Sequence, residues 1–370
     1  MKIGFDAKRA FLNNTGLGNY SRDSIRILGT YYPKHQFLLY TPKATKNPRL
    51  SFLEGKAQYK IHTPNSCLNT TFHGIWRSVS LSKQLQKDGV EIYHGLSHEL
   101  PKGIEKTNIK TVVTIHDLIF IRYPHLFKVI DRKIYYHKFL HACQMADHII
   151  AVSQQTKKDI IQFFSIPEHK ITVVYQGCHE VFKSQVKNEE KEAVCSKHQL
   201  PNNYLLYVSN IEERKNLLTL LKSMKELPEQ HLVVIGNGKK YKKQCLQFVK
   251  DNKLSHRTHF LSGLLLSEMR AIYQSAEMMI YPSIFEGFGI PILEALFCNI
   301  PVITSKGGCF SETGGPNSYY INPLNINELT KAIQEIKSNK DLRELMIAKG
   351  QQHAQKFTDD KIAKNLMNIY

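Results

Sequence analysis

The chain of 370 residues is too long for one compact core and suits two domains of ordinary size. Its composition, 42% hydrophobic and 22% charged, is typical of a globular protein, and no apolar run approaches the roughly 20 residues that cross a bilayer. Seven singly scattered cysteines argue against a disulfide framework and against a zinc site of paired cysteines. The N-terminus lacks a long apolar stretch, so we expect no secretory signal and predict a cytoplasmic protein.

The net charge of +18 is unevenly distributed along the chain. Residues 1–185 hold 26 Lys/Arg against 13 Asp/Glu, whereas residues 186–370 hold 24 against 19. The basic first half favours an anionic partner there, either nucleic acid or an acidic membrane surface. A basic surface that serves only solubility explains the same counts, because net charge informs on association and not on fold.

The first half of the chain alternates between predicted strands and predicted helices. We expect strands at 2–7, 36–41, 57–63, 91–95, 109–117, 148–153 and 171–177. We expect helices at 20–32, 74–88, 128–145 and 154–164. Apolar, β-branched strands that alternate with helices are typical of a parallel sheet covered on both faces.

A second series of the same kind follows the polar, strand-free run 183–200, which we interpret as a linker. Its strands are expected at 204–210, 231–238, 258–263, 278–283, 301–308 and 318–322, and its last helix begins at Ile326. The prediction is an α/β protein with two doubly wound domains, 1–182 and 201–352, and a helix at 353–370 that packs across their junction. Such domains bind ligands beyond the carboxyl ends of their strands, where the strand order reverses.

The stretch "PSIFEGFGIPILEALF" carries two glutamates around a glycine turn. Glu286 comes three residues after the predicted strand 278–283, and Gly287 and Gly289 let the backbone approach a ligand closely. The free amides at the start of the following helix form an anion site. We place Glu294 in the first turn of that helix, with its side chain leaning back toward the same edge.

Glu294 lies among apolar residues, where a carboxylate is costly unless it has a partner. A ribose 2′,3′-diol meets this need, because one carboxylate accepts hydrogen bonds from two neighbouring hydroxyls. The alternative is that Glu294 only complements the dipole of its helix. The glycine turn beside it favours the diol.

The spacing of these two glutamates in "FEGFGIPILEAL" resembles the signature of the retaining family-4 glycosyltransferases. Further matching motifs lie along nearly the whole chain: "GLGNY", "TIHDLIFIRYP", "AVSQQTKKDI", "VYQG", "ERKNL" and "VIGNG". The resemblance implies the GT-B fold, in which two Rossmann-like domains face each other across a cleft. The segment "TIHDLIFIRYP" is similar to the branch that contains bacterial O-antigen mannosyltransferases.

The resemblance assigns roles to the residues of the glycine turn. In similar enzymes the first glutamate contacts the hydroxyls of the donor sugar, so Glu286 is predicted to be catalytic. The second glutamate, Glu294, is predicted to bind the nucleotide ribose. The amides of Gly287, Phe288 and Gly289 are predicted to hold the sugar and the phosphates.

Arg214 and Lys215 follow the predicted strand 204–210 and are expected to neutralise the diphosphate as it leaves. Such a pair is commonly a solvated surface, but its place after a strand at the switch point favours binding. Gly236, in "GNGKK", resembles the loop near the nucleobase in this family. The chain has no D-x-D motif and no cluster with metal-ligand spacing, so we predict no metal and no cofactor.

Residues of the first domain are predicted to complete the site. Gly16 and Gly18 form a tight loop before a helix, and amides there cap the donor diphosphate in the prediction. His116 ends a strand, and the matching histidine in similar enzymes contacts the donor sugar near the reacting carbon, so His116 is predicted to be catalytic. Asp117 is predicted to orient His116 or to contact the acceptor.

The reaction implied is the transfer of a hexose, with mannose as the first candidate, from a nucleotide diphosphate sugar to a glycan or lipid-linked acceptor. GDP-mannose or a UDP-sugar is the expected donor, and the anomeric configuration is retained by front-face departure of the leaving phosphate. The basic first domain then binds the acceptor and lies at the inner face of the cell membrane. Residues 129–144, which mix basic and apolar side chains, are the proposed contact.

Other functions fit parts of the sequence. A phosphorylase or a nucleotide-sugar epimerase shares the architecture, and a glycoside hydrolase also uses two carboxylates. A nucleic-acid-binding protein fits the charge, but no zinc-finger or RNP-like motif accompanies it, so we expect no nucleic-acid partner. A dinucleotide-dependent dehydrogenase lacks its G-x-G-x-x-G after the first strand.

Overall fold

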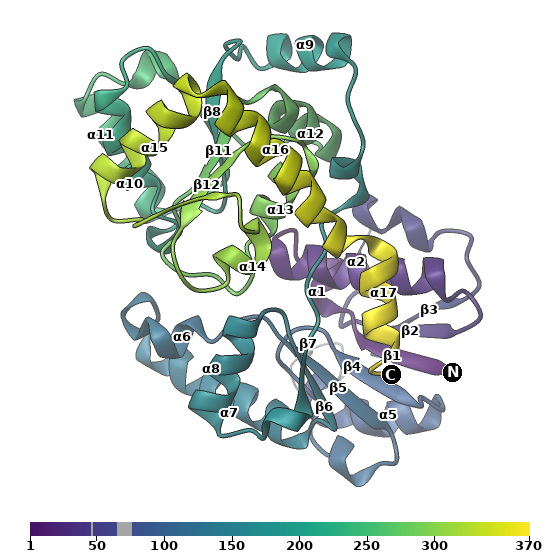
Figure 1. Cartoon of the computed structure of the whole chain (residues 1–370). Coiled ribbons are helices and arrows are strands. Elements are labelled where there is room, and N and C mark those ends of the chain that lie inside the picture. Colours follow the sequence, from purple (N-terminus) through teal and green to yellow (C-terminus); the bar gives the residue numbers. More distant parts are fainter. Residues whose placement is uncertain (46, 65–75) are drawn as a thin grey trace. The chain divides into compact units, whose positions relative to one another are not determined.

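The computed structural model describes residues 1–45, 47–64 and 76–370 and divides them into two α/β units (Figure 1). Unit 1 consists of Met1–Gly177 and Phe357–Tyr370, and unit 2 of Cys178–Lys356. Cys67 and the first two residues of the predicted helix 74–88 lie outside the described residues.

Unit 1 is built on a parallel sheet of seven described strands in the order β3-β2-β1-β4-β5-β6-β7. All seven predicted strands of the first half are confirmed: β1 Lys2–Asp6, β2 Gln36–Tyr40, β3 Tyr59–His62, β4 Ile92–Gly95, β5 Lys110–Ile115, β6 His148–Ala151 and β7 Ile171–Val173. The order reverses between β1 and β4, so the switch point of unit 1 lies between these two strands.

Helices cover the sheet of unit 1. The α-helices are α1 Lys8–Leu12, α2 Gly16–Tyr31, α5 Leu81–Lys87, α6 Ile119–Arg122, α7 Val129–Met145, α8 Gln154–Phe164 and α17 Asp359–Met367. The apolar faces of β4, β5 and β6 pack against α7 and α8 in one buried cluster. In the part of the chain that the structure describes, no helix combines the length and the apolar character that crossing a membrane requires.

Unit 2 repeats the plan with six described parallel strands in the order β10-β9-β8-β11-β12-β13. The six predicted strands are confirmed: β8 Tyr204–Val208, β9 His231–Ile235, β10 Thr258–Leu261, β11 Met278–Tyr281, β12 Val302–Ser305 and β13 Tyr319–Ile321. Its switch point lies between β8 and β11, both of which are buried along their whole length, as expected for the centre of a covered parallel sheet.

The helices of unit 2 alternate with these strands. They are α9 Asn188–Lys197, α10 Leu217–Ser223, α11 Lys240–Asp251, α12 Leu266–Ser275, α13 Ile290–Phe297, α14 Phe310–Gly314, α15 Ile326–Ser338 and α16 Lys340–Ala354. The predicted start of the last helix of the series, Ile326, is the first residue of α15.

The first boundary between the units differs from the predicted domain end at residue 182. Residues 178–182 belong to unit 2, because Phe182 packs edge-on against Tyr273 at 5.4 Å between ring centroids. The carbonyl of Phe182 also accepts a hydrogen bond from Cys298 Sγ. These contacts are long-range, so the sequence pattern alone gives no sign of them.

The predicted linker 183–200 contains a helix. Helix α9 occupies Asn188–Lys197 and packs against α12, where Arg270 Nη2 lies 3.2 Å from Glu190 Oε1. None of its residues is buried, so no apolar periodicity marks it in the sequence. The linker residues are therefore part of unit 2.

The C-terminal segment, predicted as a junction helix at 353–370, returns to unit 1. Helix α17 packs against α2, and Arg26 Nη2 lies 2.8 Å from Asp359 Oδ2. The side chain of Ile362 is buried. The structure divides 353–370 between the end of α16 in unit 2 and α17 in unit 1.

Candidate functional site

The switch point of unit 2 gathers a buried ionic cluster from two loops. The loop after β11 carries Glu286, which is 7% exposed, and the loop after β8 carries Arg214 and Lys215. Glu286 Oε1 lies 2.9 Å from Arg214 Nη1 and 2.5 Å from Lys215 Nζ. The same oxygen accepts hydrogen bonds from Ser283 Oγ at 2.6 Å and Tyr281 Oη at 3.1 Å. Three of the predicted site residues thus lie together.

The electrostatics of this cluster favour an anionic ligand. Burial disfavours the charged form of Glu286, but Arg214 and Lys215 outweigh burial and lower the pKa of Glu286 to about 2. Burial lowers the pKa of Lys215, and the charge of Glu286 opposes that shift. Among these three side chains two are cationic and one is anionic, and the charge of Glu212 also acts on Lys215. The four contacts all reach Oε1 of Glu286, so none of them engages Oε2.

The turn after Glu286 is fixed by α14 and its N-cap. Cys309 Sγ donates to the carbonyls of Glu286 and Phe288, and Thr313 Oγ1 donates to the carbonyl of Phe288 at 2.6 Å. The side chain of Phe288 is buried, which anchors the turn. Gly289 has φ +97° and is the N-cap of α13, a conformation that glycine adopts without strain. Among the first residues of α13, Pro291 has no N–H and the amide of Ile292 donates to the carbonyl of Gly289, so the amide of Ile290 is the candidate donor for a ligand.

Glu294 is buried, as predicted, but its surroundings differ from the prediction. It is the fifth residue of α13 and lies in the second turn of the helix, and not in the first. Its Oε2 accepts a hydrogen bond from Tyr273 Oη of α12 at 2.7 Å. Sequence reasoning missed this partner, because a tyrosine 21 residues away gives no local signal.

Gly236 follows β9 at the carboxyl edge of the same sheet. A Cβ atom there would lie 1.8 Å from the carbonyl oxygen of Ser209, in the loop after β8. Glycine is therefore required for the two loops to pass each other, whether or not a ligand binds. The predicted role of Gly236 near a nucleobase stays a prediction.

The two predicted glycines of unit 1 differ in their environments. Gly16 begins α2, and a Cβ atom there would meet nothing within 4 Å. At Gly18 a Cβ atom would lie 1.8 Å from the carbonyl oxygen of Asn13, and the Gly18 amide donates to Asn13 Oδ1 at 3.2 Å. The amide of Gly18 is therefore engaged within the chain, and the anion site predicted for both glycines reduces to the amides of Gly16 and Leu17.

His116 follows β5 and is 5% exposed. Its Nε2 lies 2.9 Å from the carbonyl oxygen of Leu96, and Gln176 Nε2 lies 3.4 Å from its Nδ1. These contacts assign a neutral ring that donates from Nε2 and accepts at Nδ1. Burial lowers the pKa of His116 to about 4. With both ring nitrogens engaged, His116 is a poor proton acceptor in this arrangement.

Asp117 holds the start of α6. Its Oδ1 accepts a hydrogen bond from the amide of Ile119 at 3.1 Å. The ring of His116 is oriented by Leu96 and Gln176, so the structure offers an orienting set other than the predicted one. Contact of Asp117 with an acceptor stays a prediction.

The switch point of unit 1 carries an ion-pair chain that sequence reasoning missed. Asp6, at the end of β1, is buried, and its Oδ2 lies 3.1 Å from Arg77 Nε. Arg77 Nη2 lies 2.5 Å from Glu99 Oε2, and Glu99 Oε1 lies 3.4 Å from Lys138 Nζ. Asp6 ends β1 and Glu99 follows β4, and these two strands border the switch point. This position at the carboxyl ends of the strands could have identified both residues from the sequence.

Comparisons with known proteins cover both units. Residues 33–180 match the family described as Glycosyltransferase Family 4, and residues 188–353 match the family described as Glycosyl transferases group 1. The two matches together indicate a GT-B glycosyltransferase. All the predicted unit 2 residues of this glycosyltransferase, from Arg214 to Glu294, lie within the group 1 match.

Two of the similar proteins are mannosyltransferases of bacteria. The chain is 27% identical over 286 residues to O-antigen chain mannosyltransferase B of Escherichia coli, across 75% of this chain and 74% of that protein. It is 30% identical over 231 residues to O-antigen chain mannosyltransferase RfbU of Salmonella typhimurium, across 62% of this chain and 61% of RfbU. The structure of Anabaena Alr3699/HepE in complex with UDP-glucose superposes with a TM-score of 0.78 at 17% identity, covering 100% of this chain and 98% of that one, which confirms the GT-B fold.

Proposed function

We propose that this chain transfers a hexose, with mannose as the first candidate, from a nucleotide diphosphate sugar to a glycan or lipid-linked acceptor in surface polysaccharide synthesis. The observation that carries the proposal is the buried cluster of Arg214, Lys215 and Glu286 at the switch point of unit 2. The carboxylate of Glu286 can accept hydrogen bonds from the hydroxyls of a sugar, and the cations Arg214 and Lys215 can bind a diphosphate.

The cluster divides the work of donor binding. Oε2 of Glu286 accepts a hydrogen bond from a hydroxyl of the donor sugar. Oε1 keeps its contacts with the four side chains described above. Arg214 and Lys215 stabilise the negative charge that develops on the leaving diphosphate. The amide of Ile290, at the start of α13, adds a donor for phosphate. Glu294 binds the ribose diol, because one carboxylate accepts hydrogen bonds from two neighbouring hydroxyls.

The chemistry of His116 supports front-face transfer with retention. A buried histidine whose pKa is lowered to about 4, and whose nitrogens are both engaged, does not take the acceptor proton. The leaving phosphate oxygen takes that proton instead. Arg214 and Lys215 supply the positive charge that a metal ion gives other transferases, so the proposed reaction is metal-independent.

The choice of donor rests on the relatives. The O-antigen mannosyltransferases of Escherichia coli and Salmonella typhimurium favour mannose, and hence GDP-mannose. The complex of HepE with UDP-glucose keeps a UDP-sugar as the second candidate. Unit 1, with its excess of basic residues, binds the acceptor, and the protein acts at the cytoplasmic face of an anionic membrane.

A thermal-shift panel of GDP, UDP and ADP tests the proposal. A ligand that binds only the folded chain raises the melting temperature in proportion to its occupancy. At least one of the three nucleotides should raise the melting temperature of the wild type. Glu294→Ala should abolish this rise. Glu286→Gln should keep the rise but lose the sugar-transfer activity. The exposed Glu54 provides the matched control, since Glu54→Ala should change neither readout. No rise with any of the three nucleotides contradicts the proposal.

A further inference from the structure

The first turns of α7 expose large apolar side chains. Val129 is 58% exposed, Ile130 71% and Ile134 46%. Isolated apolar residues on a surface are ordinary, but several within six residues of one helix mark a surface that another molecule covers.

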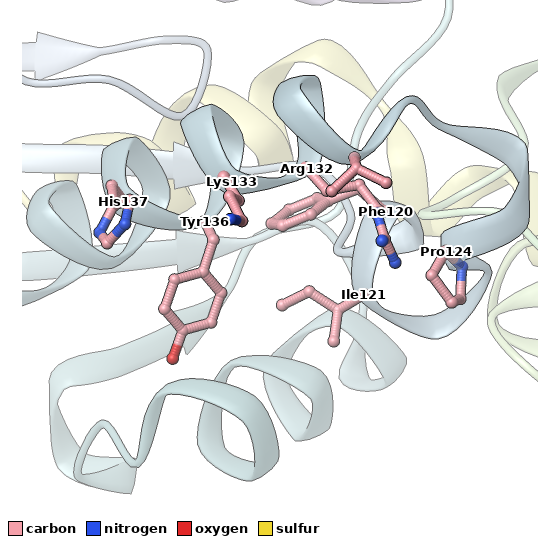
Figure 2. Close-up of a pocket in the computed structure, with 8 residues that line it drawn as sticks. Phe120, Ile121, Pro124, Arg132, Lys133, Tyr136 and His137 are labelled. Atoms are coloured by element: carbon pink, nitrogen blue, oxygen red, sulfur yellow. The ribbon is translucent and has the colours of Figure 1, made fainter.

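A pocket opens beside these residues, between α6, the 3-10 turn η4 (Pro124–Leu126) and α7 (Figure 2). Its volume is about 340 Å³. Phe120, Ile121 and Pro124 give it an apolar wall, and Tyr136 projects from α7 on another side. Pockets that bind small molecules have volumes of roughly 300–1,000 Å³ and mostly apolar linings, so this one fits an apolar chain.

Three basic residues of α7 also line the pocket: Arg132, Lys133 and His137. Within the described ranges, no carboxylate forms an ion pair with any of the three, whereas Arg122 on α6 is paired with Asp159. Arg132 Nε is buried and has no hydrogen-bond partner among the described residues. The guanidinium of Arg132 remains partly exposed, and a phosphate is a strong, charge-assisted acceptor for its other N–H groups.

The same helix continues to the ion-pair chain at the switch point of unit 1. Phe139 stacks on His98 with ring centroids 4.2 Å apart, and Lys138 Nζ lies 3.4 Å from Glu99 Oε1. Arg132 and Phe139 are seven positions apart, which is about 10 Å along the helix axis at a rise of about 1.5 Å per residue. A ligand of modest length can therefore touch the pocket and this ion-pair chain at once.

We propose that this pocket holds the lipid-phosphate end of the acceptor. The apolar chain lies against Phe120 and Ile121, the phosphate binds Arg132 and Lys133, and the attached sugar extends along α7 toward Glu99. The inference rests on the proposed function, because it names the acceptor of that reaction as a phosphate-linked lipid.

Calorimetric titration with dodecyl phosphate below its micelle concentration tests this site. The wild type should bind it more tightly than inorganic phosphate or the uncharged dodecyl maltoside. Arg132→Gln should weaken binding about tenfold or more, through loss of a charge-assisted hydrogen bond. Val129→Ser, at an exposed position that folding does not need, should also weaken it. Lys158→Gln removes an exposed charge from α8 as the matched control and should leave the affinity unchanged.

Equal affinity of the wild type, Arg132→Gln and Val129→Ser overturns the site, as does an absence of binding. Binding to phosphatidylglycerol vesicles without binding to monomeric dodecyl phosphate assigns the surface to a bilayer and also overturns it. The nucleotide panel separates the two proposals. If a nucleotide raises the melting temperature of the wild type but dodecyl phosphate does not bind, the lipid-phosphate site is contradicted and the proposed function is not.

Discussion

Tyr370 Oη lies 2.5 Å from His94 Nδ1, so the segment after α17 is hydrogen-bonded to the centre of the unit 1 sheet. The contact belongs to a buried chain. His94 Nε2 lies 2.7 Å from Thr114 Oγ1, which lies 2.9 Å from Tyr20 Oη. The ring of Tyr20 packs edge-on against His116, with centroids 4.6 Å apart. The C-terminal segment therefore supports the surroundings of a predicted catalytic residue.

Replacing Tyr370 with Phe removes the hydroxyl and leaves His94 with an unsatisfied buried nitrogen. We expect Tyr370→Phe to lower the free energy of unfolding by about 1–3 kcal/mol. Urea denaturation measures it. Tyr31→Phe removes a hydroxyl from a residue that is 47% exposed and should change the unfolding free energy little. Equal midpoints for Tyr370→Phe and the wild type would show that the hydrogen bond contributes nothing.

Replacing each of the two glycines in the first turn of α2 with alanine should affect stability differently. Gly18→Ala drives a Cβ atom into the backbone at Asn13, which should cost about 3 kcal/mol of stability, as overpacking does. Gly16→Ala enters open space and should stay within about 0.5 kcal/mol of the wild type. Thermal melting of both variants checks this. Similar losses in the two variants would contradict the geometry.

The strands and the switch-point residues could be predicted because their causes are local. Apolar, β-branched runs mark buried parallel strands, and Arg214, Lys215 and Glu286 each follow such a run, so their meeting follows from the topology. The individual contacts could not be predicted. Whether Arg214 and Lys215 face solvent or pair with Glu286 depends on loop conformations that the spacing does not fix.

Other parts of the site depend on partners far away in the sequence. Tyr273 reaches Glu294 from another helix, and Asn13 takes the amide of Gly18. No sequence pattern marks Tyr273 or Asn13 as a partner of these site residues. The same reason explains the linker: α9 has no buried residue and no apolar periodicity, and its packing against α12 shows that it is part of unit 2.

The ionic cluster of unit 2 predicts a dependence of stability on acid pH. The pKa of Glu286 is about 2 in the folded chain, below its ordinary value of 4.5. Its contribution to stability is therefore complete above pH 4.5 and is lost as the pH falls toward 2. Glu286→Gln should show a shallower loss of stability over this range than the wild type. The exposed Glu54 serves as control, and Glu54→Gln should keep the wild-type slope. If the stability of Glu286→Gln and that of the wild type fell in parallel with pH, the ion pairs of Glu286 would not cause the acid dependence.

The contact between Tyr273 and Glu294 predicts a coupled effect on stability and ligand binding. Tyr273→Phe removes the hydroxyl that donates to Glu294 at 2.7 Å, which should cost about 1–3 kcal/mol. If Glu294 binds the ribose, loss of the Tyr273 hydrogen bond changes how its carboxylate is held, so the nucleotide-induced rise in melting temperature should shrink as well. Tyr31→Phe, at an exposed position, should preserve both quantities. A destabilised Tyr273→Phe with a full nucleotide response would make the contact purely structural.

The buried histidines of unit 1 predict a second pH range, at higher pH than that of Glu286. Burial lowers the pKa of His116 to about 4 and, together with the charge of His116, that of His94 to about 3, from an ordinary value of 6.5. Between pH 6.5 and 4 the unfolded chain binds more protons than the folded chain, so stability falls as the pH falls through this range.

His116→Gln tests this range, because glutamine keeps a donor for the carbonyl of Leu96 and does not titrate. Melting temperatures measured from pH 7 to pH 4 should fall less steeply for His116→Gln than for the wild type. Some slope should remain, since His94 still titrates in the unfolded chain. The exposed His256 gives the matched control, and His256→Gln should follow the wild type. A wild-type melting temperature that stays constant over this range would mean that the histidines are already accessible to protons in the folded chain.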